Sequence, residues 1–426
     1  MRMLMKEKII CVAVVAACVC GANADFREWA ATPPMGWNSW DCYGAAVDEA
    51  DFRANVDVLA ERLKPFGYEY AVCDIRWTVQ NEGLKGYNQE NPVYTLDAWG
   101  RYVPAPNRFP SAAKGAGFKP LADYCHAKGL KFGIHIMRGV PKEAVAKKLP
   151  VKGANGITCD QIGEGKVECC WLRDNCDVVQ GRPGAQEYYD SIFALYAEWG
   201  VDLVKCDDLS APYHKGEIEM IRKAIDKSGR AIVLSTSPGE TPLAENEHLQ
   251  KNANMWRVVN DVWDSWWHIE HLTPIMCEWL KKPSVQGCWP DCDMIPLGKL
   301  GLKGHYWSVD AKAKGRNCNL TADEQKTLMD FFAICRSPLM IGADLPQLDD
   351  ATFALLTDPL VLAAQRDGRG PKPLFCDREK CAIVSDNVKG GKFLALFNLK
   401  NEAAEVSALG VTRKLAPHAS VLMAVE

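Results

Sequence analysis

The stretch Asp202-Leu203-Val204-Lys205-Cys206-Asp207-Asp208 is a short apolar run that closes with two acidic residues. A second stretch, Trp256-Arg257-Val258-Val259-Asn260-Asp261, also combines a basic residue with a terminal aspartate. Side chains alternate along a strand, so Lys205 and Asp207 point to the same face. Both stretches therefore predict a strand that presents charged residues where it ends.

Similar runs recur along the chain, and amphipathic stretches separate them. The predicted strands are Met35–Trp40, Tyr70–Asp74, Lys131–Ile136, Asp202–Asp207, Ile232–Ser235, Met255–Val258, Gln286–Trp289 and Pro338–Gly342. The predicted helices include Glu49–Leu63, Gln186–Trp199, Glu217–Ser228 and Ala322–Cys335. Alternating strands and helices indicate an α/β fold with a parallel sheet, and eight such units favour a closed (β/α)8 TIM barrel over an open sheet.

The chain changes character after a predicted helix over residues 350–366. Asp367-Gly368-Arg369-Gly370-Pro371 breaks the helical pattern, and the remainder alternates like strands. We therefore expect the barrel over residues 25–366 and a small C-terminal antiparallel β domain, similar to a β-sandwich, over residues 367–426. A unit of that size is marginal alone, so it should pack on the barrel.

Composition narrows the possible partners. The 426 residues are 48% hydrophobic and carry a formal net charge of -4, so the chain is globular and lacks the basic balance that nucleic-acid binding requires. It has no phosphate-cradling glycine loop and no Gly-x-Ser-x-Gly elbow, which disfavours a nucleotide enzyme and a serine hydrolase. No Cys/His spacing is typical of zinc sites, so we expect no cofactor and no metal ion.

Residues 1–24 have the three regions of a secretory signal: early basic residues, an apolar run over residues 9–20, and Ala22-Asn23-Ala24. The apolar run is too short for a comfortable membrane span. Val15-Ala16-Ala17-Cys18 also fits a bacterial lipoprotein processing site, which would leave a lipid on Cys18. We predict an exported protein, periplasmic or extracellular, with soluble export favoured and a lipid anchor as the alternative.

The cysteine count also bears on export. Of 18 cysteines, three lie in residues 1–24, which leaves 15, an odd number, so at least one thiol must be free. Oxidation is expected after export. The candidates for disulfide bonds are Cys376, Cys381, Cys159, Cys169, Cys170 and Cys176, and their spacing does not fix the connectivity.

Polar residues gather at the predicted carboxyl ends of strands, where barrel enzymes place their working groups. These residues are Asp74, His135, Lys205, Asp207, Ser237, Arg257, Asp261, Asp291 and Asp293. Two aspartates beside bases fit glycoside cleavage, which needs one ionised carboxylate at the anomeric carbon and one carboxyl group that protonates the leaving oxygen. The pattern predicts a glycosidase; a sugar-binding protein without turnover is the remote alternative.

With these strand ends aligned, residues 32–366 resemble the melibiase-type glycoside hydrolases of family 27, whose best-known members are α-galactosidases. The resemblance rests on Pro33-Pro34-Met35-Gly36-Trp37-Asn38-Ser39-Trp40, Trp199-Gly200-Val201-Asp202-Leu203-Val204-Lys205-Cys206-Asp207-Asp208 and Trp289-Pro290-Asp291-Cys292-Asp293-Met294. It implies that Asp207 is the nucleophile, that Asp261 is the general acid and then the base, and that the reaction retains configuration. Lys205 would favour the ionised form of Asp207.

As the acid, Asp261 must hold its proton. Closeness to Asp207 and burial under Trp263 or Trp266 would favour that form.

The resemblance also implies substrate contacts. Trp40 would form the aromatic floor of the sugar site, and Asp74 would accept hydrogen bonds from hydroxyls remote from the anomeric carbon. Lys205 would donate to a hydroxyl, and Arg257 with Asp293 would hold the hydroxyl next to the anomeric carbon. The expected partner is therefore a carbohydrate.

Three further positions complete the predicted site. His135 falls where relatives often place a tyrosine, with a satisfied core histidine as the alternative. Ser237 belongs to Ser235-Thr236-Ser237-Pro238-Gly239, which replaces an acidic-aromatic run of animal members and would reshape the pocket. Trp171, in a long loop, would be a lid or stacking wall, or else a buried loop anchor.

The residue after Asp74 departs from the family pattern. Typical α-galactosidases of the family carry a second aspartate there, and the two acids grip the 4-hydroxyl and the 6-hydroxyl. Here the run is Cys73-Asp74-Ile75-Arg76-Trp77, and isoleucine cannot accept a hydrogen bond. We expect a retaining exo-acting α-galactosidase that releases terminal α-D-galactosyl residues from oligosaccharides or glycans. The alternatives are β-L-arabinopyranosidase, which acts on galactose's analogue without the exocyclic carbon, and α-N-acetylgalactosaminidase.

Overall fold

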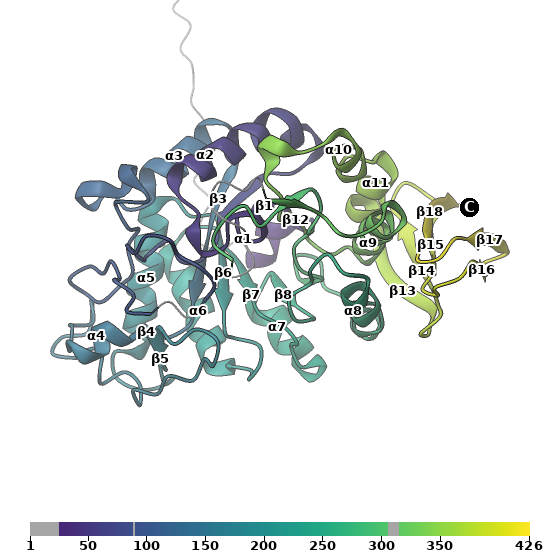
Figure 1. The fold of residues 1–426 in the computed structure, drawn as a ribbon. Helices are drawn as coiled ribbons and strands as arrows, with labels where there is room; N and C mark the ends of the chain where they lie inside the picture. Colours follow the sequence, from purple (N-terminus) through teal and green to yellow (C-terminus); the bar gives the residue numbers. More distant parts are fainter. Residues whose placement is uncertain (1–24, 88–89, 306–314) are drawn as a thin grey trace, which may run out of the picture.

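The computed structural model describes residues 25–87, 90–305 and 315–426. The predicted signal segment 1–24, and Cys18 with it, lie outside the described residues. The main body is a parallel eight-stranded sheet curled into a barrel, and an antiparallel β domain stands at one side of it (Figure 1). The predicted (β/α)8 fold with a C-terminal β domain is confirmed.

All eight predicted strands are present in the barrel sheet, in the order β12-β1-β2-β3-β6-β7-β8-β9. They are β1 (Met35–Asn38), β2 (Tyr70–Cys73), β3 (Lys131–Met137), β6 (Leu203–Asp207), β7 (Val233–Thr236), β8 (Met255–Arg257), β9 (Trp289–Asp291) and β12 (Leu339–Ile341). The sheet closes beyond β9, where Ile295 forms a parallel bridge with Ile341. The Ile295 N–H donates to the Met340 carbonyl at 2.7 Å, and the Gly342 N–H donates to the Ile295 carbonyl at 3.0 Å.

Helices surround the sheet (Figure 1). They are α1 (Trp40–Tyr43), α2 (Glu49–Val58), α3 (Lys119–Ala127), α4 (Lys142–Ala146), α5 (Ala185–Trp199), α6 (Lys215–Ser228), α7 (Asn246–Asn252), α8 (Trp266–Trp279), α9 (Ala322–Cys335), α10 (Asp350–Leu356) and α11 (Pro359–Asp367). The prediction of a single helix over residues 350–366 is wrong. The chain forms two helices there, α10 and α11, because Asp358 caps the second. Its carboxylate accepts the N–H groups of Leu360 and Val361, and Pro359 takes the first helical position.

The loops carry two short ladders, β4 (Val140–Pro141) with β5 (Asn175–Cys176), and β10 (Lys299–Leu300) with β11 (Arg316–Asn317).

Alternation along the strands builds the barrel in layers. Val72, Leu203 and Met255 belong to one buried cluster inside the barrel, whereas Val204 and Cys206 pack in the larger core under the helices. Residues two positions further along each strand point the same way. The inward positions above this apolar layer are Asp74 after β2, Lys205 and Asp207 on β6, and Arg257 on β8. A charged layer therefore lies above an apolar one.

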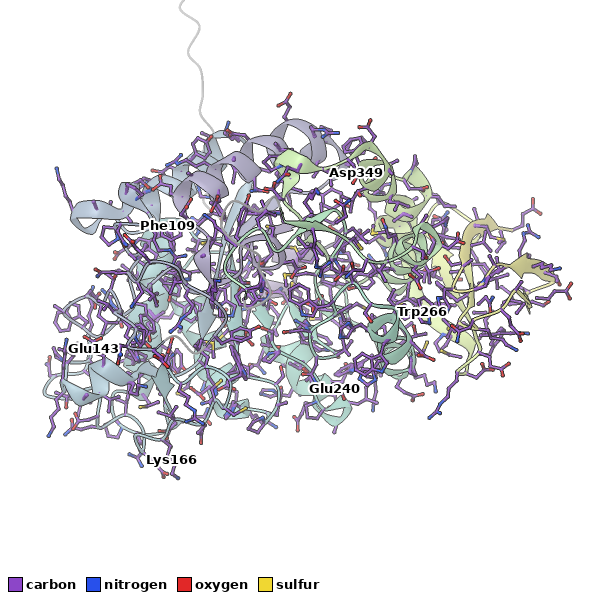
Figure 2. All side chains as sticks on the ribbon, viewed as in Figure 1. Phe109, Glu143, Lys166, Glu240, Trp266 and Asp349 are labelled. Carbon is purple, nitrogen blue, oxygen red and sulfur yellow. The ribbon has the colours of Figure 1, made fainter. Side chains whose placement is uncertain are left out.

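The C-terminal domain contains a four-stranded antiparallel sheet and a hairpin. The sheet consists of β13 (Gly368–Cys376), β14 (Lys380–Asn387), β15 (Lys392–Asn398) and β18 (Ser420–Val425), and the hairpin of β16 (Ala404–Ala408) and β17 (Val411–Leu415). Phe397 packs against Phe331 of α9 with ring centroids 5.6 Å apart. Trp266, at the start of α8 and labelled in Figure 2, stacks on His418 at 3.9 Å. The domain thus packs on α8 and α9.

Candidate active site

A pocket of about 350 Å³ opens at the carboxyl ends of the strands. It is lined by Trp40, Asp74, Ile75, Tyr87, Trp171, Lys205, Asp207, Pro238, Arg257, Asn260, Asp261 and Met294. The pocket thus brings together Lys205 and Asp207 from the end of one strand with Arg257 and Asp261 from the end of another. Most of its polar groups come from the charged layer at the strand ends, and the other lining residues come from the segments that follow the strands.

Asp207 is buried at the end of β6, with only 8% of its surface exposed. One carboxylate oxygen accepts a hydrogen bond from His135 Nε2 at 2.8 Å, and the other accepts the Asp208 N–H at 3.0 Å. Burial alone would raise the pKa of Asp207, but the hydrogen bond and charge of His135, together with Lys205, lower it below the ordinary value. The site therefore keeps Asp207 ionised, as a nucleophile requires.

Asp74 and Lys205 form a buried ion pair beside Asp207. The Lys205 ammonium lies 3.1 Å from Asp74 Oδ2, which also accepts from the Asn38 amide at 2.8 Å. Burial would raise the pKa of Asp74, but Lys205, His135 and Asn38 lower it to about 2. An ionised acceptor and a charged donor thus lie together on one wall, the arrangement that vicinal sugar hydroxyls can bridge.

Arg257 holds the opposite wall. Its guanidinium lies 2.7 Å from Asp293 and 3.2 Å from Asp261. Asp293 is buried, whereas the Asp261 side chain is 46% exposed at the pocket mouth. The expected burial of Asp261 under Trp263 or Trp266 is wrong, because the Asp261 side chain is exposed; Trp266 stacks instead on His418 of the C-terminal domain.

Three predicted site residues are not among those lining the pocket. His135 contacts Asp207 through Nε2, and its Nδ1 is buried without a hydrogen-bond partner among the described residues. Asp293 lies behind Arg257 and accepts the Val262 N–H at 2.7 Å. Ser237 is fully buried, and its neighbour Pro238 lines the pocket instead.

Aromatic rings form the remaining wall. Trp40 stacks on Tyr87 with centroids 4.9 Å apart and planes inclined by 21°. Tyr87 and Trp171 in turn form a T-shaped pair, with ring centroids 4.9 Å apart and planes inclined by 70°. Trp40 and Trp171 were predicted from the sequence to lie at the pocket, whereas Tyr87 was not, because it follows a glycine in a loop without strand or motif signals. The other lining residues not chosen from sequence were Pro238, Asn260 and Met294.

An ionised carboxylate beneath a second, more exposed one, in a sugar-sized pocket at the carboxyl face of a β/α barrel, is the arrangement of a glycoside hydrolase. Comparisons with known proteins agree. A melibiase-type family model described as alpha galactosidase A matches residues 173–367. The structure is similar to a β-L-arabinopyranosidase of glycoside hydrolase family 27 from Geobacillus stearothermophilus, solved with arabinose, with a TM-score of 0.88 and 41% identity over 93% of this chain and 97% of that one.

Two relatives carry other specificities. The chain is 28% identical to alpha-galactosidase A of Cellvibrio japonicus, over 92% of this chain and 82% of the relative. It is 25% identical to the alpha-N-acetylgalactosaminidase of Rattus norvegicus, over 86% of this chain and 75% of the relative. The chain belongs to glycoside hydrolase family 27.

Proposed function

We propose that this glycosidase releases terminal β-L-arabinopyranosyl residues with retention of configuration. The observation that carries the proposal is the buried Ile75 side chain, which lines the pocket directly after the sugar-binding candidate Asp74. L-Arabinopyranose has the ring hydroxyl arrangement of galactose but lacks the exocyclic carbon and its hydroxyl. The similar arabinopyranosidase from Geobacillus stearothermophilus supports the same choice.

Ile75 should discriminate between the two sugars because its side chain forms no hydrogen bonds. A galactoside would bring its 6-hydroxyl toward a side chain that neither donates nor accepts a hydrogen bond. Burying an unpaired hydroxyl costs about 1–3 kcal/mol, or roughly 5- to 150-fold in affinity. An arabinoside brings no such group, so its binding loses nothing there. The pocket should therefore favour the pentose.

Two carboxylates carry the proposed reaction. Asp207 attacks the anomeric carbon while Asp261 donates a proton to the leaving oxygen, which gives a covalent glycosyl-enzyme. Asp261, now ionised, takes a proton from water, and the water oxygen displaces Asp207. His135 holds the Asp207 carboxylate in place, and Arg257 positions Asp261 from 3.2 Å away.

Alpha-galactosidase activity is the second candidate. The relative from Cellvibrio japonicus is named alpha-galactosidase A, and this chain aligns with 82% of its length. Trp40, Asp74 and Lys205 would contact parts of the ring that galactose and arabinopyranose share. The two candidates therefore differ in the pocket around Ile75, not in the catalytic pair.

Side-by-side hydrolysis of p-nitrophenyl β-L-arabinopyranoside and p-nitrophenyl α-D-galactopyranoside tests the choice, with Asp207→Asn as the blank. We expect kcat/KM to be at least about tenfold higher for the arabinoside. Ile75→Asp should shift the ratio toward the galactoside, whereas Ile75→Val, which stays apolar, should preserve it. A galactoside preference in the wild type would support the second candidate. Failure to hydrolyse either substrate would contradict both candidate activities.

A further inference from the structure

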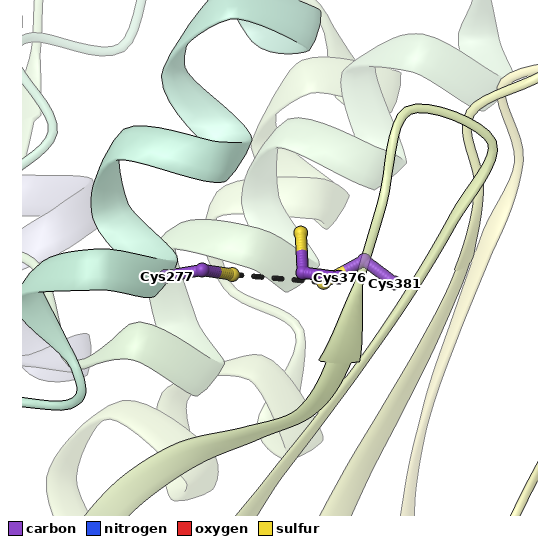
Figure 3. Close-up of side chains that lie close together, drawn as sticks. All are labelled: Cys277, Cys376 and Cys381. Atoms are coloured by element: carbon purple, nitrogen blue, oxygen red, sulfur yellow. Dashed lines mark hydrogen bonds between the residues drawn. The ribbon is translucent and has the colours of Figure 1, made fainter.

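Three cysteine sulfurs converge where α8 meets the C-terminal domain (Figure 3), and none of the three cysteines lines the active-site pocket. The sulfurs of Cys277, Cys376 and Cys381 all lie within 4.8 Å of one another. The Sγ atoms of Cys277 and Cys381 are 3.7 Å apart. All three are free thiols.

Two separate parts of the chain bring these sulfurs together. Cys277 lies on α8, whereas Cys376 and Cys381 are cross-strand partners on β13 and β14. The turn between the strands is held by Asp377, whose carboxylate accepts the N–H groups of Glu379 and Lys380 at 2.7 and 2.8 Å. The hairpin therefore fixes two sulfurs, and the packing of the domain on α8 adds the third.

The arrangement suits a cation better than three neutral thiols. Cys277 and Cys381 are buried, with 2% and 0% of their surfaces exposed, and thiols are only weak hydrogen-bond donors. Two sulfurs bound to one tetrahedral zinc ion at about 2.3 Å lie about 3.8 Å apart. The 3.7 Å between Cys277 and Cys381 matches that edge without rearrangement.

The cluster is open to an entering ion on one side. Cys376 is only partly buried, whereas Cys277 and Cys381 are buried. A thiolate, not a thiol, is the ligand that metals bind, so binding of a cation would release the thiol protons.

We propose that Cys277, Cys376 and Cys381 bind one thiophilic d10 cation of the Zn²⁺ type, which links α8 to the β13–β14 hairpin. Sulfur ligands select zinc and similar soft ions over Mg²⁺ and Ca²⁺. Each ligating thiol releases its proton to solvent, and no group is oxidised or reduced. Water can occupy the fourth position on the exposed side of Cys376. The site is independent of the proposed glycosidase activity.

Metal titration of reduced, metal-depleted full-length protein tests the site. With Cd²⁺ as the probe, thiolate-to-metal charge-transfer absorption should saturate at one equivalent, and native mass spectrometry should find one bound Zn²⁺. Loss of even an outer-shell partner costs roughly 10- to 100-fold in affinity, so Cys376→Ser should bind at least about tenfold more weakly. Cys318→Ser, at another partly buried cysteine, should bind like the wild type.

Three outcomes would overturn the proposal. The first is wild-type protein that binds no ion by either method. The second is a Cys376→Ser protein that binds as tightly as the wild type. The third is peptide mapping of protein purified without reductant that finds Cys376 bonded to Cys381, or Cys277 to either, since a disulfide would consume the ligands. Wild-type stoichiometry decides the question even if the variants fail to fold.

Discussion

Among the groups that lower the pKa of Asp207, the proposed nucleophile, His135 is the buried neighbour that contacts it directly. His135 is 1% exposed and lies outside the pocket lining, yet it donates the hydrogen bond that reaches the carboxylate at 2.8 Å. In the proposed mechanism it is a positioning residue, because it contacts Asp207 and is not among the residues that line the pocket. Its effect should therefore appear in the pH dependence of turnover more than in substrate binding.

Replacing His135 should change the acidic limb of the pH profile. The proposed nucleophile Asp207 works only when ionised, so activity should be lost as pH falls through its pKa. Because His135 lowers that pKa, His135→Leu should raise it, so that activity is lost at higher pH than in the wild type. His135→Gln, which keeps a donor, should move the limb less. The kcat/KM profile measures both, and an unchanged limb in His135→Leu would contradict this role.

Asp261 should show a leaving-group dependence. An aryl glycoside with a good leaving group needs little protonation, whereas an alkyl glycoside depends on the acid. We expect Asp261→Asn to lose roughly 10²- to 10⁴-fold more activity on alkyl glycosides than on p-nitrophenyl glycosides. Single-turnover kinetics on both substrates make the comparison, and equal losses would argue against an acid role.

At the scale of elements, helix α9 belongs to the barrel and also forms part of the interface with the C-terminal domain. The C-terminal end of α9 is followed by strand β12 of the barrel, and the helix packs on β15 and β18 of the C-terminal domain. Ser420 donates to Asp330 at 2.6 Å, and Thr327 donates to the His418 carbonyl at 2.7 Å. The domain is thus fixed by polar contacts around the Phe331–Phe397 ring pair.

Shortening Phe397 should destabilise the protein. The ring is 1% exposed between β15 and α9, so Phe397→Ala should lower the free energy of unfolding by about 3–5 kcal/mol. Val388→Ala, at a side chain that is 56% exposed, should change it by less than about 0.5 kcal/mol. Urea denaturation followed by circular dichroism compares the two variants. A Phe397→Ala protein as stable as the Val388→Ala control would show that the packing of the domain on α9 contributes little to the free energy of unfolding.

Strands and charged strand ends could be predicted because both signals are local. Periodicity defined all eight strands, although β9 begins at Trp289 and not at Gln286, since Gly287 and the Val285–Cys288 bridge form a turn first. Tyr87 could not be found, because its place over Trp40 depends on how a loop folds back. Cys277 was missed for a related reason: its spacing from Cys376 reveals nothing until α8 and the hairpin meet.

At the scale of the whole molecule, residues 1–24 have the pattern of a secretory signal. No helix among residues 25–87, 90–305 and 315–426 is long and apolar enough to cross a membrane. We propose that residues 1–24 direct export and are removed. Expressed with this leader in a bacterium, the protein should appear in the periplasm or medium, and its N-terminus should be close to Asp25. A lipid-modified Cys18 would support the anchored alternative, and an intact Met1 in the cytoplasm would contradict export.

Chemical rescue of Asp207→Ala tests the central claim most directly. Without the carboxylate, hydrolysis of p-nitrophenyl β-L-arabinopyranoside should fall by at least about 10³-fold. Azide should restore p-nitrophenolate release, because it fits the vacated space and attacks the anomeric carbon from the same side, which gives a glycosyl azide of inverted configuration. Turnover undiminished without azide, or an azide product of retained configuration, would contradict Asp207 as the nucleophile of this glycosidase.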